Sequence, residues 1–236
     1  MKTVTANEIK LLRSLREKKY RDASGLFVVE GEKMVGEAME SGFGIEAVYR
    51  REEVGEKVME RISSLSSPSP VLAVVRRPVA VTPEVGGLCL ALDSVRDPGN
   101  LGTILRICDW FGIDSVFASE DTVEEFNPKV IQASMGAVFR KTVCYCDLAE
   151  LCRRFKASGL KVFGTFLGGE DIYSAPLPAE GLVIMGNEAD GISERIAAEV
   201  DCRLTIPSFA RGRGAESLNV AVAAAVTVSE FKRRER

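Results

Sequence analysis

Three polar loops constrain the fold of this chain more than any other feature, because each lies between a short apolar run and an apolar segment with helical periodicity. They cover residues 97–102, 186–191 and 206–220. Repeated strand, loop and helix segments are typical of a parallel sheet, in which such loops gather at the carboxyl edge of the strands. The sequence therefore predicts one shared site built from the three loops.

The second part of the chain alternates short apolar strands with helical segments. All-apolar strands of this kind indicate an α/β fold, with a parallel sheet that helices cover on both faces. We expect strands at residues 88–92, 115–118, 141–144, 161–165, 181–185 and 202–206, and helices at 101–111, 129–134, 147–158, 193–199 and 218–233.

The first 77 residues have the pattern of a separate, smaller α/β unit. Two prolines and a glycine pair follow within residues 78–87, a composition typical of a linker between domains. We therefore expect a first domain at 1–77, a linker at 78–87 and a second domain at 88–236. The first domain is expected to contain strands at 26–30, 45–49 and 71–75, helices at 7–17, 33–41 and 54–65, a helix cap at Thr5 or Asn7, and a basic turn after the first helix.

Charge is unevenly distributed along the chain. The net charge is −3, from 31 basic and 34 acidic residues, so the overall basic field typical of nucleic-acid-binding proteins is absent. Basic side chains nevertheless cluster near the amino terminus and in the third loop. Each cluster alone fits a solvated surface, whereas the clusters together favour a surface that binds phosphate. The basic residues concerned are Lys10, Arg13, Arg16, Lys18, Lys19, Arg21, Arg211 and Arg213.

Absent residue types disfavour several kinds of chemistry. The chain has no histidine, which removes histidine-based catalysis and histidine-ligated metals. Its six cysteines form no C-x-x-C pair, so we expect buried free thiols rather than a disulfide or a metal site. No apolar run reaches the ~18 residues of a membrane span, and the amino terminus lacks the apolar core of a secretory signal. We expect a cytoplasmic protein.

The first loop leads into a helix that carries an arginine among apolar residues. Pro98-Gly99 makes a tight turn, and Asn100 is suited to brace a neighbouring loop. Arg106 on the following helix needs a partner, because an unpaired buried charge is costly. A structural salt bridge with Glu188 is one interpretation of Arg106, and a functional role is the other.

The second and third loops also have a purely structural interpretation. Gly186 and Gly191 bracket Glu188 in a pattern that occurs in ordinary turns between a strand and a helix. Ser217 and Asn219 are both suited to cap the helix that follows them. Neither the dinucleotide fingerprint G-x-G-x-x-G nor the phosphate loop G-x-x-x-x-G-K-[ST] is present, which disfavours a Rossmann dehydrogenase and an NTPase.

Together and in this order, the three loops resemble the SpoU/TrmH family of RNA ribose 2′-O-methyltransferases, within the SPOUT superfamily. The residues that carry the resemblance are D-P-G-N-L-G-T-I-L-R at 97–106, G-N-E-A-D-G-I-S at 186–193, and I-P at 206–207 with S-L-N-V at 217–220. The resemblance covers residues 88–232. The first unit looks like the substrate-binding domain of this family, a small fold similar to certain ribosomal proteins, through residues 18–31.

The resemblance implies a fold and a cofactor that residue patterns alone do not show. The family fold is a parallel sheet whose carboxyl-terminal segment forms a deep trefoil knot. Family members are homodimers with the active site between subunits, and their cofactor is S-adenosylmethionine. Carried over onto this chain, the cofactor contacts are Thr165, Gly186, Ile206 and Leu218.

The resemblance also implies the catalytic residues. The family residue that matches Arg106 is proposed as the base that removes the proton of the ribose hydroxyl. A guanidinium stays protonated because its pKa lies above ~12, so holding an RNA phosphate and stabilising charge on the oxygen suit Arg106 better. The residues expected to orient Arg106 and the loops are Asn100, Glu188, Ser217 and Asn219.

The chain departs from the family in its third loop. Residues 208–216 form a longer and more basic segment than is typical, and it contains Arg211 and Arg213. These arginines either reach the RNA or mark an insertion that reshapes the cofactor pocket.

The predicted function is therefore S-adenosylmethionine-dependent methylation of a ribose 2′-hydroxyl in RNA, with the two-domain form favouring ribosomal over transfer RNA. One alternative is an RNA-binding or assembly protein with the same fold and little or no catalytic activity, which the altered third loop keeps open. Another is an α/β enzyme for a small molecule, which the basic clusters disfavour. The expected partners are RNA and a second copy of the chain, with no membrane and no metal.

Overall fold

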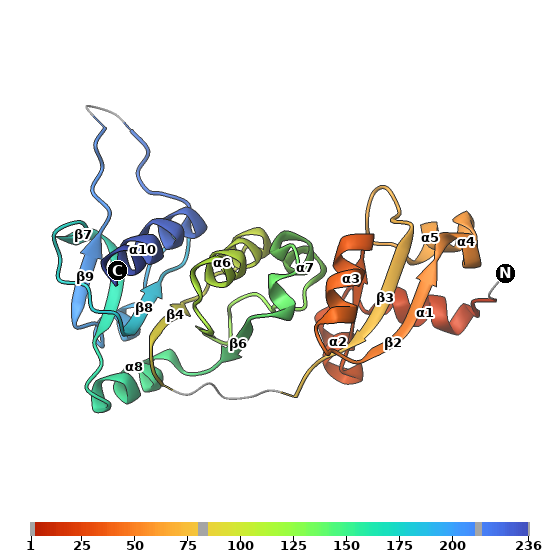
Figure 1. Ribbon diagram of the computed structural model, residues 1–236, viewed down its shortest axis with the longest axis horizontal. Coiled ribbons are helices and arrows are strands. Elements are labelled where there is room, and N and C mark those ends of the chain that lie inside the picture. Colours follow the sequence, from red (N-terminus) through yellow and green to blue (C-terminus); the bar gives the residue numbers. More distant parts are fainter. Residues whose placement is uncertain (1–2, 80–84, 211–213, 236) are drawn as a thin grey trace.

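The computed structural model describes residues 3–79, 85–210 and 214–235. Two units lie side by side along the long axis of the molecule (Figure 1). The first unit ends with strand β3 (Val71–Arg76), and the second begins with strand β4 (Leu88–Leu92). Residues 80–84 of the predicted linker lie outside the described residues, as do Arg211 and Arg213.

The first unit is a three-stranded antiparallel sheet in the order β1-β3-β2. Alternate residues of β3 face two cores. Leu72 and Val74 pack with side chains of α1 and α5, whereas Ala73 and Val75 pack with α3 and with the second unit. The remaining elements are α1 (Ala6–Ser14), α2 (Lys18–Ser24), β1 (Leu26–Glu30), α3 (Glu32–Glu40), β2 (Ile45–Arg50), α4 (Arg51–Val54) and α5 (Glu56–Ile62).

Local signals explain α1 and correct the prediction around it. Thr5 caps the helix, because its Oγ1 accepts a hydrogen bond of 3.2 Å from the Glu8 backbone N–H while the Glu8 carboxylate accepts one from the Thr5 N–H. The basic turn predicted after α1 is instead the short helix α2. The helix predicted at 54–65 is the shorter α5, and the preceding α4 was not predicted; Gly55, with a φ of +85°, separates the two helices.

The second unit is the predicted parallel sheet, with six strands in the order β6-β5-β4-β8-β7-β9. Every residue of β4 and of β8 (Gly181–Met185) is buried, as expected for strands covered on both faces. Strand β7 (Val162–Asp171) is longer than predicted and pairs with β9 (Cys202–Thr205) on both sides of an irregularity. The other strands are β5 (Ser115–Ala118) and β6 (Thr142–Tyr145).

Helices cover both faces of this sheet. The three leucines of β4 face a core shared with α6, α7 and α10, whereas Cys89 and Ala91 face a core shared with α8 and α9. Helices α6, α7 and α10 therefore form one layer, which Figure 1 shows over the sheet. The helical elements are α6 (Pro98–Phe111), α7 (Pro128–Ser134), η1 (Ala137–Phe139), α8 (Leu148–Ala157), α9 (Glu194–Ala197) and α10 (Val220–Arg234).

Candidate functional site at the carboxyl edge of the sheet

Asn100 connects the first loop to the second. The Asp97 carboxylate caps α6 by accepting a hydrogen bond of 2.8 Å from the Asn100 backbone N–H, which places Asn100 in the first helical turn. The Asn100 side chain is thereby free to reach a neighbouring loop. Its Nδ2 donates a hydrogen bond of 2.8 Å to Oε1 of Glu188, on the loop after β8.

Asn219 connects the third loop to the first. Its Oδ1 accepts hydrogen bonds from the backbone N–H groups of Ala221 and Val222, so Asn219 is the cap of α10. Its Nδ2 donates a hydrogen bond of 2.8 Å to Oδ1 of Asn100. Ser217, the other predicted cap, is exposed and makes no side-chain hydrogen bond with any residue that the structure describes.

The three loops therefore meet through one continuous chain of side-chain hydrogen bonds, from Asn219 through Asn100 to Glu188. The Asn100 amide uses its oxygen toward one loop and its nitrogen toward the other. This arrangement confirms that the three loops come together, while their forming one functional site stays a prediction. It also contradicts the structural interpretation of Arg106 as the salt-bridge partner of Glu188, because the Glu188 carboxylate pairs with Asn100 instead.

Further contacts that the sequence analysis missed hold the second loop against the end of β4. Asp93 is buried, and its Oδ2 accepts a hydrogen bond of 2.7 Å from the backbone N–H of Ser193. The Asn187 side chain donates to the backbone oxygen of Ser94 at 2.6 Å. Ser94 has a φ of +56°, an uncommon value for a residue other than glycine. In the sequence, Asp93 could have been recognised as a candidate because it is a carboxylate directly after the all-apolar strand 88–92.

The four predicted cofactor residues lie toward the same edge: Thr165 within β7 beside the last residues of β8, Gly186 and Ile206 just after β8 and β9, and Leu218 next to the cap of α10. Gly186 follows β8, and a Cβ there would lie 2.2 Å from the carbonyl carbon of Gly191, so only glycine fits. Thr165 donates a hydrogen bond of 3.1 Å to the backbone oxygen of Ile184 on the adjacent strand. Ile206 follows β9 and is partly buried, whereas Leu218 is half-exposed beside Asn219.

Arg106 lies elsewhere than predicted. It is exposed on α6 and makes no hydrogen bond or ion pair with any residue that the structure describes. Leu105 and Cys108 point into the core, while Arg106 lies on the outer face of the helix with Trp110. The expectation of a buried arginine with a partner was wrong, because apolar neighbours in sequence occupy a different face of the helix.

The amino-terminal basic cluster divides into exposed and buried members. Lys10 and Arg13 are exposed on α1. Lys18 pairs with Asp22 at 2.7 Å and Lys19 with Glu17 at 3.1 Å, both at the surface, and Arg16 donates to the backbone oxygen of Ser63.

Arg21 was predicted to contact RNA, and the structure contradicts this prediction. It is 2% exposed and is bonded to Glu124 of the second unit, so it offers no surface to RNA. The two remaining predicted contacts, Arg211 and Arg213, lie outside the described residues.

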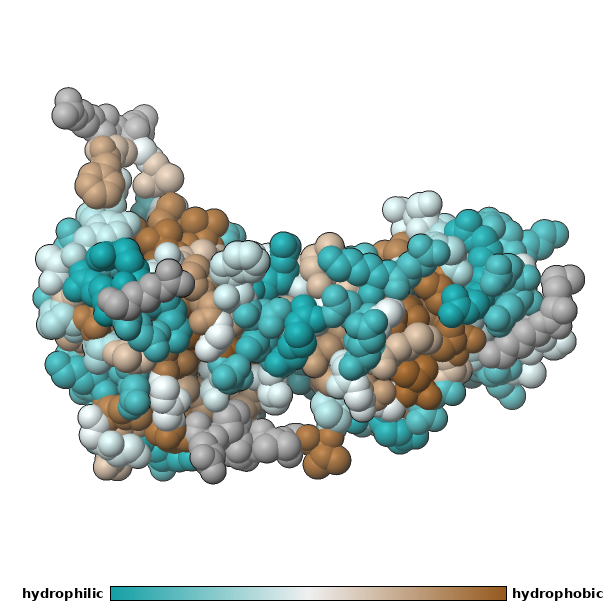
Figure 2. All heavy atoms as spheres, viewed as in Figure 1, coloured by the Kyte–Doolittle hydropathy of each residue, from teal (hydrophilic) through white to brown (hydrophobic). Residues whose placement is uncertain are grey.

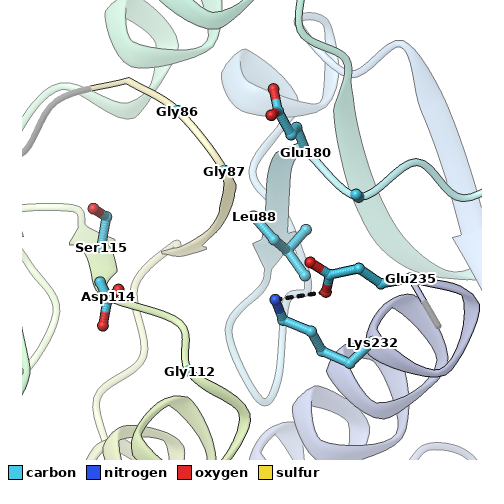
Figure 3. A pocket seen from close by; sticks show the side chains of 10 residues that line it. Gly86, Gly87, Leu88, Gly112, Asp114, Ser115, Glu180, Lys232 and Glu235 are labelled. Atoms are coloured by element: carbon cyan, nitrogen blue, oxygen red, sulfur yellow. Dashed lines mark hydrogen bonds and ion pairs between the residues drawn. The ribbon is translucent and has the colours of Figure 1, made fainter.

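A hollow of about 210 Å³ lies away from this site, at the amino-terminal edge of the sheet (Figure 3). Its lining includes Leu88 at the start of β4, Ser115 at the start of β5 and Glu180 just before β8. The three loops leave the other edge, so the hollow is not part of the predicted site.

All six cysteines are free, and three of them, Cys89, Cys108 and Cys152, are buried. Burial raises the pKa of the Cys108 and Cys152 thiols to about 12, so both stay protonated at neutral pH. Across residues 3–79, 85–210 and 214–235, no group of three or more acidic or thiol side chains is placed to hold a metal ion, and no helix is long and apolar enough to cross a membrane.

The parallel sheet and the loops bonded to one another at its carboxyl edge define an α/β protein, a class in which ligands generally bind at that edge. Comparison with known proteins gives its family. The chain belongs to the SpoU rRNA methylase family, whose model matches residues 87–229, and residues 6–56 match the MRM3-like substrate binding domain. The predicted family is therefore confirmed.

The similarity to known proteins covers both units of the chain. The 23S rRNA (guanosine(2553)-2′-O)-methyltransferase of Bacillus subtilis is 31% identical and covers 95% of this chain and 96% of its own length. A solved structure of a TrmH-family protein from Porphyromonas gingivalis is 42% identical, with a TM-score of 0.90, and covers 99% of this chain and 100% of its own. An AdoMet-bound rRNA methyltransferase from Sinorhizobium meliloti is 29% identical, with a TM-score of 0.87 and coverage of 99% and 97%.

Proposed function

We propose that this protein transfers a methyl group from S-adenosylmethionine to a ribose 2′-hydroxyl of ribosomal RNA. The observation that carries the proposal is the bonded chain of Asn219, Asn100 and Glu188, which joins the three loops by which the family is recognised. The family match over the second unit and the full-length similarity to a 23S rRNA 2′-O-methyltransferase support the reaction and the substrate.

The residues at the carboxyl edge fit a cofactor with an adenosine and an amino-acid part. The ends of β7, β8 and β9 offer backbone groups, and Thr165, Gly186 and Ile206 lie beside them. Leu167 and Leu218 are apolar and exposed at the same edge, where a bound nucleoside would cover them. When bound, S-adenosylmethionine supplies a methyl group that is electrophilic without further activation.

Arg106 is proposed to act on the RNA rather than on the cofactor. Its guanidinium carries a permanent charge and two parallel donors, which suit a phosphate next to the target ribose. The same charge would stabilise the oxygen as it loses its proton. Asn100, Glu188 and Asn219 then hold the loops, and Ser217 remains a candidate for orienting the substrate.

A second copy of the chain is proposed to complete the site. Arg106 lies about 9 Å farther along the axis of α6 than Asn100, on the outer face of the helix, and no described residue of its own chain pairs with it. Exposed apolar side chains share this layer, including Trp110 at 85% exposure and Val222 at the start of α10. Figure 2 shows apolar surface around the start of α10. Burial of this surface in a homodimer would bring Arg106 to the partner's loops.

The first domain, 1–77, is proposed to bind RNA through Lys10, Arg13, Arg16, Lys18 and Lys19, with Arg211 and Arg213 adding contacts from the third loop. The carboxyl-terminal segment is proposed to form the trefoil knot, on the ground of the family match over residues 87–229. A ribosomal RNA substrate is consistent with a cytoplasmic location.

Methyl incorporation tests the proposed function directly. Purified protein and labelled S-adenosylmethionine are incubated with total RNA from a strain that lacks this protein, and 2′-O-methylated nucleotides are mapped. We expect label in ribosomal RNA at a nucleotide whose methyl group is missing from that strain. Cofactor binding without any transfer would support the alternative of an RNA-binding or assembly protein. Label confined to transfer RNA would contradict the substrate.

A further inference from the structure

The two units of this chain are joined by a buried ion pair, although the sequence predicts a linker between them. Arg21 of α2 donates from Nη2 to Oε2 of Glu124 at 2.6 Å, and from Nε to both carboxylate oxygens at 3.2 Å. Its Nη1 donates to the backbone oxygens of Leu15 and Arg16 at 2.8 Å each. All three nitrogens of this guanidinium are therefore bonded, and separation of the units would leave its charge unpaired.

A second arginine binds the same carboxylate. Arg77, directly after β3, donates from Nη2 to Oε1 of Glu124 and from Nη1 to Asp22 at 2.8 Å. Its guanidinium also lies over the ring of Phe126, 5.4 Å from the centroid. Glu124, on the segment between β5 and α7, is 9% exposed and thus holds two arginines of the first unit.

Four phenylalanines pack next to these charges, two from each unit. Phe27 stacks on Phe126 with ring centroids 4.5 Å apart, and Phe43 meets Phe139 edge-on at 5.4 Å. These side chains belong to one hydrophobic core that extends from the first sheet to α6 and α10. Since relative motion of domains is expected unless their interface is large and hydrophobic, a shared core argues for a fixed arrangement.

A third contact lies at the turn after α7. Gly136 has a φ of +97°, and a Cβ there would lie 2.8 Å from the carboxyl carbon of Glu37 on α3. The Glu37 carboxylate pairs with Arg140, which also donates to Asp109 of α6 at 2.9 Å. The first unit therefore contacts the second unit both before α7 in the chain, at Glu124 and Phe126, and after it, at Gly136 and Arg140.

Helix α7 packs in turn against α6, the helix that carries Asn100 and Arg106. Gly102 of α6 faces α7, where a Cβ would lie 2.6 Å from the Ala133 Cβ and 2.7 Å from the Val130 backbone oxygen. Only the methyl group of Ala133 lies between the two helices at that point. Because α6 carries both Asn100 and Arg106, packed contacts connect the first unit to the site without passing through the linker.

We propose that the first unit is a rigid extension of α6 and α7, and that Glu124 is the positioning residue that fixes its distance from Arg106. This inference rests on the proposed function. The protein would then select a folded RNA in which a docking element and the methylated ribose are separated by one defined spacing. A freely tethered first unit would instead accept a range of spacings.

The paired substitution Arg21→Gln with Glu124→Gln tests this inference. It removes both buried charges together, so neither of these two charges is left unpaired; glutamine at 124 keeps the volume of glutamate, while glutamine at 21 is shorter than arginine. For whole ribosomal RNA we expect KM to rise roughly tenfold while kcat changes less than about twofold, since docking and not chemistry is affected. For a short RNA with only the target nucleotide and its neighbours, KM and kcat should match those of the wild-type protein.

Arg76→Gln is the matched control. Arg76 neighbours Arg77 in sequence, but its ion pair with Glu46 lies at the surface within the first unit. We expect the same KM as wild type on both RNAs. A second double variant, Glu37→Gln with Arg140→Gln, removes the more exposed ion pair between the units. It should also raise KM for whole ribosomal RNA, by less than the Arg21→Gln with Glu124→Gln variant.

Small-angle scattering provides a measurement that needs no RNA. The wild-type profile should fit one rigid shape, and the Arg21→Gln with Glu124→Gln protein should have a larger radius of gyration. A wild-type profile of two independently moving bodies would overturn the inference. So would a folded double variant with unchanged KM and an unchanged pattern of methylated nucleotides. If wild-type protein methylates no RNA, the proposed function fails, while scattering still decides whether the units are rigid.

Discussion

Asn219 Nδ2 lies 2.8 Å from Asn100 Oδ1, although the two residues are 119 positions apart in the chain. Asn100 in turn donates to Glu188, so a single amide both accepts from the third loop and donates to the second. A carboxylate cannot donate and a hydroxyl is too short to span both partners. The amide at position 100 therefore joins the two loops in a way that neither a carboxylate nor a hydroxyl side chain can replace.

The substitution Asn100→Asp should weaken cofactor binding. The new carboxylate cannot donate to Glu188 and places two negative charges together, so the loops should separate. Loss of a bond of this kind costs about 1–3 kcal/mol, which corresponds to roughly 5- to 150-fold in affinity. Isothermal titration with S-adenosylmethionine measures this change. Asn127→Asp is the control, because Asn127 only caps α7 and aspartate is an equally good cap. Wild-type affinity in Asn100→Asp would show that the amide does not shape the pocket.

Gly186→Ala should destabilise the protein. The added Cβ would lie 2.2 Å from the carbonyl carbon of Gly191 and 2.3 Å from the nitrogen of Ile192, and both atoms are backbone. Forced displacement of this kind costs about 1–3 kcal/mol, measurable by urea unfolding. Gly168→Ala, on β7, is the control, because a Cβ there meets no atom within 4 Å. Equal stability of the two variants would mean that the second loop is not held against β8.

Much of the fold was predictable because its determinants are local. The strands of the second unit were recognised from continuous apolar runs, which a sheet covered on both faces requires. Thr5 and Asn219 were each one of two predicted caps, beside Asn7 and Ser217, because a cap side chain bonds to N–H groups only two or three residues later. Helix α4 was missed because it has only four residues, too few for apolar periodicity to show.

The contacts of the charged residues were not predictable in the same way. Arg21 was grouped with surface lysines and arginines because its partner, Glu124, lies 103 positions later, and sequence alone does not show that the two meet. Arg106 was expected to be buried because its neighbours in sequence are apolar. Each step along a helix turns the side chain by about 100°, so Leu105 is in the core while Arg106 is in solvent.

Arg106→Ala should strongly reduce activity without affecting stability. Since Arg106 is exposed and pairs with no described residue of its own chain, its removal should change the free energy of unfolding by less than about 0.5 kcal/mol. Methyl transfer should fall by roughly 100- to 1000-fold, as for other groups that stabilise developing charge. Arg154→Ala, an exposed arginine on α8, controls for the loss of surface charge. Near-wild-type rates in Arg106→Lys would contradict a forked contact with phosphate.

Glu124→Ala should cost about 3–5 kcal/mol of unfolding free energy, because it leaves Arg21 buried with an unpaired charge. Denaturant unfolding measures the loss. Lys18→Ala breaks an exposed ion pair on the same helix as Arg21 and should cost no more than about 1 kcal/mol. Replacing both buried partners with Arg21→Met and Glu124→Leu should restore most of the stability. A loss below 1 kcal/mol in Glu124→Ala would show that the buried pair contributes little.

Glu230 should make the stability of the protein depend on acidic pH. Its carboxylate accepts hydrogen bonds from Arg233 at 2.7 and 2.8 Å and from Arg234 at 2.8 Å. The Arg233 bonds, then those of Arg234, lower the pKa of Glu230 to about 2, from an ordinary value of 4.5. A lowered folded-state pKa contributes stability that is complete above pH 4.5 and is lost as the pH falls toward 2.

Glu230→Gln should therefore lower the unfolding free energy by about 1 kcal/mol at pH 7, a modest amount because Arg233 is largely exposed and its charge is screened. Urea unfolding at pH 7, 4 and 2.5 should show the difference between wild type and variant shrinking as the carboxylate is protonated. Glu235→Gln breaks an exposed pair with Lys232 near the same helix end and should have little effect at any of these pH values. A difference that stayed constant down to pH 2.5 would mean that Glu230 acts through packing and not through its charge, and the bonds to Arg233 and Arg234 would then not fasten the end of α10.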